Sequence, residues 1–334
     1  MSTTSDAFEM AVVAVKDGRL EELRRLLAAE PQLLSARDAS GHTLLNLACK
    51  AATGDVALPA VPGTPEQHRA VDCILAAGAE PSLAADDGWA PLHTAAMTGH
   101  VDLARRLLAA GASRDGRLLN VIGGSPLALA LFYGKRDVAE LLATPAVPDN
   151  LRHAAALGQP LARFFNGAAV TPAARVGCDF YRPLPIFPEW AREFTQQELL
   201  DEALTWSARN GRIQSLEALV SRGANVNTNP YRGTALLWAT YADQDEAAAW
   251  LLDHGADPDL RHDFGGAEHG RAAVAMHLAA QYGCLKVLRL LLQRGARSDI
   301  ADGAFHATPR GWAQHVGATE SLALLDEFAR GAGP

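Results

Sequence analysis

Residues 259–271 collect the side chains of this chain that are best suited to acid–base or metal chemistry. His262, Asp263, Glu268 and His269 lie there among three glycines. A carboxylate beside an imidazole can act as a general acid–base pair, and both groups ligate Zn²⁺ or Fe²⁺. His262 and His269 are separated by six residues, however, which matches no compact helical ligand pair. We therefore predict no metal site and no cofactor, and we keep Asp263, His269 and Glu268 as candidates for binding or catalysis.

A second group of candidates lies in an aromatic and proline-rich stretch at residues 178–190. Four aromatic residues and three prolines in this stretch differ from the composition of a flexible linker. If exposed, the aromatic side chains would form the kind of apolar patch that marks a binding surface. The stretch either plugs a seam between structural elements or lines a groove. In the second case its binding residues would be Tyr181, Arg182 and Trp190.

The elements that would position these residues follow from an internal repeat. The clearest copy begins at Ala90 with Ala-Pro-Leu-His-Thr-Ala-Ala, and half of the copies follow the preceding one at about 33 residues. Self-similarity at this period indicates a solenoid in which each unit contacts its neighbours. Nine copies begin at Glu9, Thr43, Ala90, Ser125, Asp149, Glu202, Thr234, Val274 and Thr308.

Glycines punctuate the repeat at a constant offset. Nine residues after the start, seven of the nine copies have glycine, and the exceptions are Ala52 and Asp243. Glycine readily adopts the left-handed conformation that ends a helix. Between the glycines, apolar residues recur three and four apart, as in 101–108, so each copy is predicted to form two short amphipathic helices.

The copies resemble ankyrin repeats, whose Thr-Pro-Leu-His-x-Ala start and Gly-Ala-Asp end are nearly complete in the copies at Ala90, Thr234 and Val274. The resemblance implies an all-α ankyrin-repeat solenoid of about nine helix-turn-helix units with projecting hairpin loops and a concave face. The histidine position of the family holds His93 and His277, but other residues elsewhere. The loop-bracing hydrogen bonds of the family therefore cannot be uniform along the chain.

The resemblance also places several candidates on hairpin tips. Residues 229–233, 259–271 and 302–306 would project from one edge, so Tyr231, Arg232 and His306 would join the residues of the 259–271 loop in one polar site. Trp89 precedes its repeat start on an earlier tip, where exposure favours contact with a partner. Three other tryptophans occupy a core position of the repeat and are predicted to pack inside: Trp206, Trp238 and Trp312.

These features predict three regions. Residues 1–166 would hold repeats one to five, with an insertion at 53–66. Residues 167–199 would form an aromatic and proline-rich insertion. Residues 200–334 would hold repeats six to nine, with the extended loop 259–271.

Composition excludes some classes of function. The net charge is −8, and no Lys/Arg stripe is present, which argues against nucleic acid as a partner. No stretch approaches the ~20 apolar residues that span a bilayer, and the first residues lack a secretory pattern, so we expect no membrane insertion and a cytoplasmic location. The four cysteines are scattered, which favours neither structural zinc nor a disulfide framework.

The leading interpretation is a protein or peptide interaction module that binds through the concave face and loop tips of the C-terminal repeats. The alternative is an enzyme in which the central insertion and the 259–271 loop enclose a small-molecule pocket, with acid–base chemistry by Asp263, His269 and Glu268. A structural adaptor without one dominant site is a third possibility. No nucleophile elbow, phosphate-binding loop or HExxH pair favours the enzyme.

Overall fold

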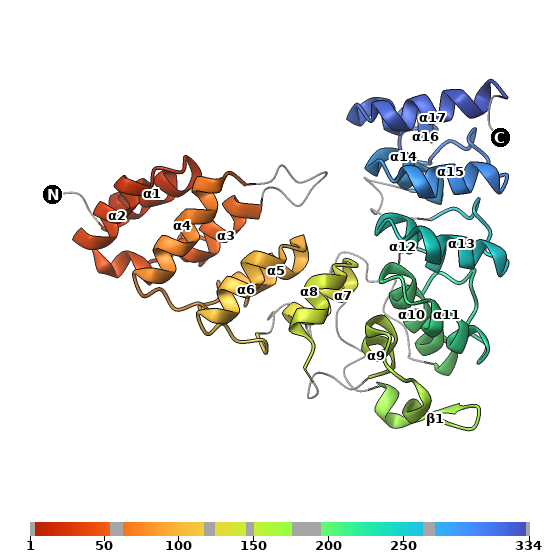
Figure 1. Cartoon of the computed structure of the whole chain (residues 1–334), viewed down its shortest axis with the longest axis horizontal. Helices are drawn as coiled ribbons and strands as arrows, with labels where there is room; N and C mark the ends of the chain where they lie inside the picture. Colours follow the sequence, from red (N-terminus) through yellow and green to blue (C-terminus); the bar gives the residue numbers. More distant parts are fainter. Residues whose placement is uncertain are drawn as a thin grey trace. The chain divides into compact units, whose positions relative to one another are not determined.

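The structure is a computed structural model that describes residues 4–53, 63–116, 124–144, 150–175, 195–230, 232–262 and 271–331. Helices dominate these residues, and the described strands form a single two-stranded hairpin. The all-α repeat architecture predicted from the sequence is confirmed, and the helices follow one another in pairs (Figure 1).

The chain divides into two compact bodies. The N-terminal body comprises residues 1–130 and 135–145, and the C-terminal body comprises residues 131–134 and 146–334. The first four repeats supply the helix pairs α1 (Thr4–Lys16) and α2 (Leu20–Ala29), α3 (Leu44–Thr53) and α4 (Pro65–Ala76), α5 (Pro91–Thr98) and α6 (Val101–Ala109), α7 (Pro126–Phe132) and α8 (Arg136–Leu142), with the 3₁₀ turn η1 (Pro31–Leu34) after α2.

The fifth repeat has a different second half. Its first helix is α9 (Leu151–Leu157), and instead of a second helix it continues into η2 (Ala162–Phe164), the antiparallel strands β1 (Phe165–Asn166) and β2 (Ala169–Val170), and η3 (Pro172–Arg175). The remaining pairs are α10 (Gln196–Arg209) and α11 (Ile213–Val220), α12 (Ala235–Tyr241) and α13 (Asp245–Asp253), α14 (Ala275–Tyr282) and α15 (Leu285–Gln293), α16 (Pro309–Val316) and α17 (Thr319–Ala329).

Side-chain hydrogen bonds at the N-termini of α4 and α10 determine where these helices begin. Thr64 caps α4 by accepting a hydrogen bond from the Gln67 amide, and the Gln67 side chain accepts one from the Thr64 amide in return. The same box between Thr195 and Glu198 starts α10 six residues ahead of the repeat start assigned at Glu202. The first helix of repeat six is therefore longer than the repeat pattern indicates.

The glycines that lie nine residues after the repeat starts have the predicted left-handed backbone conformation. All seven glycines at the ninth position have φ between +65° and +80°. Asp243, one of the two exceptions, adopts the same conformation without being glycine, with φ +52°. The other exception, Ala52, lies inside α3, which continues to Thr53.

First helices of neighbouring repeats stack on one another in both bodies. α1 packs on α3 and α3 on α5, while α10, α12, α14 and α16 follow in the C-terminal body.

An aromatic cluster lies in the C-terminal body. Trp206 and Trp238 are buried in it, as predicted, and both contact the Phe132 ring edge-on. The buried Arg209 guanidinium lies 3.7 Å from the Trp238 ring centroid and donates to the Phe132 carbonyl at 2.8 Å.

Hairpin loops are braced by buried polar side chains at one repeat position. His93 Nδ1 accepts from the Ala90 amide, and its Nε2 lies 3.1 Å from the Gly124 carbonyl oxygen. Asn46 performs the same two tasks in repeat two, accepting from the Thr43 amide and donating to the Trp89 carbonyl. A different residue type can thus supply the brace, which holds the Trp89 loop against α3.

Candidate functional site

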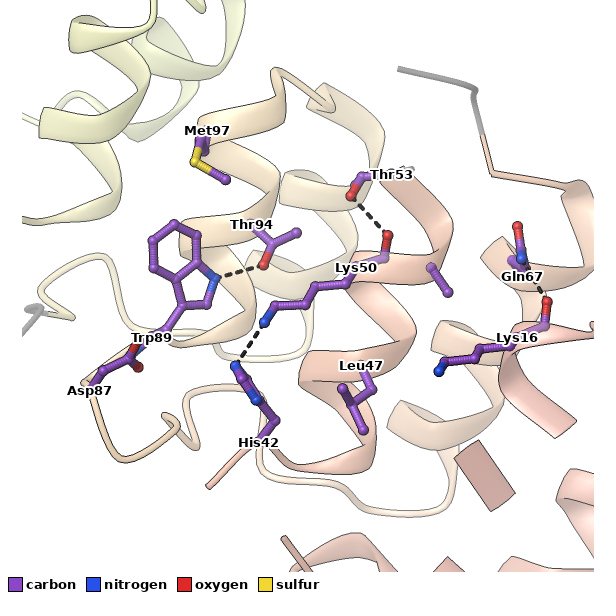
Figure 2. Close-up of a pocket in the computed structure, with 11 residues that line it drawn as sticks. Lys16, His42, Leu47, Lys50, Thr53, Gln67, Asp87, Trp89, Thr94 and Met97 are labelled. Atoms are coloured by element: carbon purple, nitrogen blue, oxygen red, sulfur yellow. Dashed lines mark hydrogen bonds between the residues drawn. The ribbon is translucent and has the colours of Figure 1, made fainter. Parts of the chain in front are cut away.

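The N-terminal body contains a hollow of about 760 Å³ on the side of its first helices. Its walls come from α1, α3, α4 and α5 and from the loops that precede α3 and α5 (Figure 2). The hollow is lined by Lys16, His42, Leu47, Lys50, Ala51, Thr53, Gln67, Asp87, Trp89, Thr94 and Met97.

Trp89 forms the apolar wall of the hollow and is held in place by its neighbours. It is half-buried, and its indole Nε1 donates to Thr94 Oγ1 at 2.8 Å. Its ring lies 5.7 Å from that of His93, and its amide donates to Asp87 Oδ1 at 2.9 Å. These contacts fix the orientation of the indole, which pre-organises it for a ligand.

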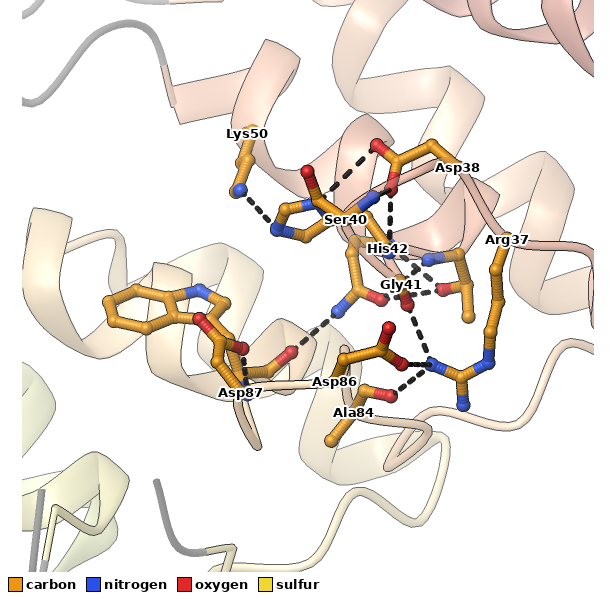
Figure 3. A network of polar contacts seen from close by, with 12 residues as sticks. Arg37, Asp38, Ser40, Gly41, His42, Lys50, Ala84, Asp86 and Asp87 are labelled. Carbon is orange, nitrogen blue, oxygen red and sulfur yellow. Dashed lines mark hydrogen bonds and ion pairs between the residues drawn. The ribbon is translucent and has the colours of Figure 1, made fainter. Parts of the chain in front are cut away.

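The polar wall is a chain of three side chains. Asp38 Oδ2 lies 3.3 Å from His42 Nδ1, and Lys50 Nζ lies 2.7 Å from His42 Nε2 (Figure 3). An ammonium group has only donors, so Nε2 accepts and the imidazole proton resides on Nδ1, facing the carboxylate. Asp38 therefore sets the tautomer of His42, and His42 sets the position of the Lys50 ammonium group.

Electrostatics follow from these contacts. Burial opposes ionisation of Asp38, but the hydrogen bonds from His42 and Ser40 outweigh it and lower the pKa of the carboxyl group. Burial lowers the pKa of Lys50, and the carboxylates of Asp87 and Asp38 only partly oppose this effect. Lys50 as a whole is exposed, so its ammonium group stays accessible to a negatively charged ligand.

A second polar contact ties the two loops of the site together. Arg37 Nη1 donates to the Gly41 carbonyl at 2.6 Å and to the Ala84 carbonyl at 2.7 Å, with Asp86 Oδ1 at 3.7 Å (Figure 3). One guanidinium group therefore bridges the loop before α3 and the loop before α5. This bridge fixes the loop that bears His42 relative to the loop that bears Trp89.

Of the site residues predicted from the sequence, Trp89 belongs to this hollow, and three others are described in the C-terminal body. Arg232 is half-buried with φ +61°, and His306 is exposed with φ +53°. His262 is buried, and its Nε2 lies 3.5 Å from Thr234 Oγ1. Outside the described residues lie Tyr181, Arg182, Trp190, Tyr231, Asp263, Glu268 and His269.

The described parts of the three C-terminal loop tips touch one another in pairs. His262 reaches Thr234 behind the first tip, and the Gly303 amide of the third tip donates to the Arg271 carbonyl of the second at 2.6 Å. Asp302 is saturated inside its own loop, because it accepts from three backbone amides and from Trp312 Nε1. Among the residues that the structure describes, no three His, Cys, Asp or Glu side chains are grouped as metal ligands would be.

Near these tips, the first helices of repeats seven and eight present tyrosines. The Tyr241 and Tyr282 rings meet edge-on at 5.5 Å, and Tyr282 is 36% exposed. Burial raises the pKa of Tyr241, and the neighbouring Tyr282 and Tyr133 add to this effect. Both hydroxyl groups are therefore neutral hydrogen-bonding groups at physiological pH.

Most residues of the N-terminal hollow were not predicted from the sequence, although they share repeat positions. His42 and Trp89 each precede a repeat start by one residue, and Lys16, Lys50 and Met97 each follow one by seven. Residues at one repeat position of adjacent copies lie side by side in a stack, so this register was the signal that could have found the site. None of the described helices has the length and apolar composition needed to cross a bilayer.

Two family models match the chain. The model described as ankyrin repeats (3 copies) matches residues 64–151 and 185–262, and the model described as ankyrin repeat matches residues 274–303. Together these matches cover more than half of the sequence.

Curated relatives share the repeat and are otherwise varied. The ankyrin repeat domain-containing protein SAT10 of Stachybotrys chartarum is 28% identical over 74% of the chain and 12% of its own length. The E3 ubiquitin-protein ligase KEG of Arabidopsis thaliana is 26% identical over 94% of the chain and 19% of its own length. The cyclin-dependent kinase inhibitor 2A of Monodelphis domestica is 28% identical over 41% of the chain and 77% of its own length. The chain thus spans less than a fifth of the length of the first two relatives.

Proposed function

Because the chain belongs to the ankyrin repeat family, we propose that it is an interaction module that holds a segment of a partner protein against its first helices. Ankyrin repeats generally mediate protein–protein interaction, so a protein or peptide partner is the coarse expectation. The finer proposal concerns which surface binds and which residues anchor the partner.

The observation that carries this proposal is the half-buried Trp89 indole in the wall of the N-terminal hollow. Tryptophan is enriched among the residues that contribute most to binding, especially where its ring is fixed and partly desolvated. Trp89 is fixed by the hydrogen bonds of its indole and of its backbone. Leu47 and Met97 supply further half-buried apolar surface in the same hollow. A partner side chain inserted there would bury apolar surface without any rearrangement of the loop.

The C-terminal body offers a second candidate surface, on the concave face and loop tips that the sequence analysis predicts to bind. Among the residues that the structure describes there, Tyr282 and Phe305 are exposed, with 36% and 62% of their surface accessible. Burial raises the pKa of Tyr241 and of Tyr282, and Arg232 lies close enough to both phenols to oppose a part of this rise. Aromatic and arginine side chains together are typical of interface cores. This surface is therefore the second candidate for the partner.

The rival proposal of an enzyme rests on Asp263, Glu268 and His269, which lie outside the described residues. Its described neighbour His262 is buried and contacts Thr234, which is a loop-bracing geometry. The N-terminal hollow supports binding better than it supports this chemistry, so the interaction module is the function we put forward.

Quantitative affinity capture with the full chain tests the proposal. Partners captured by the wild type are compared with those captured by Trp89→Ala, by Tyr282→Ala and by Arg105→Ala, an exposed change on α6 that serves as control. We expect a partner whose recovery falls at least about tenfold with Trp89→Ala or Tyr282→Ala and is unchanged with Arg105→Ala. An identical partner profile for all four folded proteins would remove both surfaces from consideration.

A further inference from the structure

The charged residues that line the N-terminal hollow are two lysines and one aspartate. The chain has a net charge of −8, yet Lys16 and Lys50 outnumber Asp87 in the lining, and the Asp38 carboxylate lies behind His42, outside it. Asp87 is partly engaged, because its Oδ1 accepts from the Trp89 amide. A cationic depression on an acidic protein attracts a negatively charged group and disfavours a basic one.

Both lysines lack a carboxylate partner in the part of the chain that the structure describes. Several arginines of the same body do have one: Arg19 pairs with Asp17 and Glu22, and Arg106 pairs with Asp72. Lys50 Nζ contacts His42 Nε2 instead. An ammonium group has three donors, so at least one N–H of Lys50 remains for a ligand.

The position of the Lys50 ammonium group is fixed relative to the apolar wall. His42 holds it on one side, and Asp38 holds His42 through Nδ1. Figure 2 shows the Lys50 side chain extending along the hollow toward His42, with Trp89 on the facing side. A charged group and an aromatic ring therefore line the same hollow, and each has hydrogen-bonded neighbours that orient it. Such pre-organisation reduces the entropic cost of binding.

We propose that this hollow binds a short peptide segment of a partner in which an aspartate or glutamate stands close to a large apolar residue. The acidic side chain pairs with Lys50, and Lys16 adds to the attraction. The apolar side chain packs on Trp89, Leu47 and Met97, within a volume of about 760 Å³ that lies in the range of ligand-binding pockets. This assignment rests on the proposed function and adds the chemical class of the partner.

Peptide selection tests the assignment and does not require the natural partner to be identified first. A display library of random dodecapeptides is selected on the full chain, and the affinities of enriched peptides are measured by titration against Lys50→Glu, Trp89→Ala and Arg25→Glu. Arg25→Glu is the matched control, because it makes the same change of charge on the exposed face of α2, outside the hollow. Circular dichroism verifies that each variant is folded.

We expect enriched peptides to combine Asp or Glu with Leu, Phe or Trp within about four residues. Their affinity should fall at least about tenfold with Lys50→Glu and with Trp89→Ala, and stay unchanged with Arg25→Glu. Peptides that depend on Trp89 but lack an acidic residue, or that bind Lys50→Glu equally well, would overturn the assignment and leave the proposed function standing. If no selected peptide depends on Trp89, the assignment and the N-terminal surface of the proposed function both fail.

Discussion

Arg152 and Glu202 form an ion pair with a nitrogen–oxygen distance of 2.8 Å in the interior of the C-terminal body, where their side chains are 2% and 4% exposed. Arg152 belongs to α9 and Glu202 to α10, so the pair joins two helices that are separated by the irregular second half of repeat five. The Arg152 guanidinium also lies 4.5 Å from the centroid of the Trp206 ring. The pair therefore links the fifth repeat to the sixth at a point where the regular helix pairing is interrupted.

Removing one partner of this pair is expected to destabilise the protein strongly. Arg152→Met takes the Arg152 guanidinium away from the buried Glu202 carboxylate, which is expected to cost about 3–5 kcal/mol of unfolding free energy. The double variant Arg152→Met with Glu202→Gln removes both charges and should recover a large part of that loss. Urea unfolding of the wild type and the two variants measures this difference. A double variant as unstable as the single one would show that the loss comes from packing around Trp206 and not from charge.

The repeat architecture could be predicted from the sequence because its main determinant is local. A glycine nine residues after each start ends a helix through its own φ angle, independently of the rest of the chain. The start of α10 could not be placed in the same way, because the Thr195 capping box extends the helix beyond the repeat pattern. The Arg152–Glu202 pair was also unpredictable, since 50 residues separate its members.

The candidate site was only partly predictable, for a different reason. Trp89 could be predicted from its place on a hairpin tip, but the histidines and carboxylates that suggest chemistry are concentrated in other loops. The hollow depends instead on side chains that have ordinary surface types, such as Lys50, and that acquire a role through the neighbours which the stack gives them. The alignment of repeat positions contains this information, whereas residue type alone does not.

Two glycines with positive φ should differ in their tolerance of alanine. At Gly134, with φ +65°, an added Cβ would lie 2.5 Å from the Arg209 carbonyl oxygen and 2.7 Å from Ala242 Cβ. At Gly255, with φ +87°, it would meet nothing within 4 Å. Gly255→Ala should therefore lower the unfolding free energy only by the conformational penalty, about 1 kcal/mol. Gly134→Ala adds a steric clash and should lower it by about 2–4 kcal/mol. Thermal unfolding of the two variants compares these costs, and equal losses would contradict the close approach at Gly134.

Acid should weaken the N-terminal body through His93. Burial lowers the pKa of this fully buried histidine to about 4, since its hydrogen bonds to backbone groups offset only part of the desolvation. The unfolded chain, with a histidine pKa near 6.5, then binds more protons than the folded one between these two values. Stability is therefore complete above about pH 6.5 and falls as the pH drops toward 4, by about 2 kcal/mol between pH 7 and pH 5.

His93→Asn supplies the matched control for this pH dependence. Asn46 braces the preceding loop with the same two kinds of hydrogen bond, so asparagine fits the role and does not titrate. Urea unfolding at pH 7 and pH 5 should show a smaller loss for His93→Asn than for the wild type. The same loss in both proteins would mean that other groups, such as His277 with its lowered pKa, account for the acid sensitivity.

The described cysteines should react with thiol reagents in an order set by burial. Cys49 and Cys284 are buried, whereas Cys73 on α4 is half-buried. Burial raises the pKa of all three thiols, and with the added charge of Asp243 it raises the pKa of Cys284 to about 12. Because the thiolate is the reactive form, Cys73 should be alkylated first at pH 8, and the other two should react only as the protein unfolds.

Peptide mapping by mass spectrometry after timed exposure to iodoacetamide gives the three rates, and Cys73→Ser should remove the fast modification on α4. Alkylation of Cys49 or Cys284 as fast as that of Cys73 in the folded protein would contradict their burial.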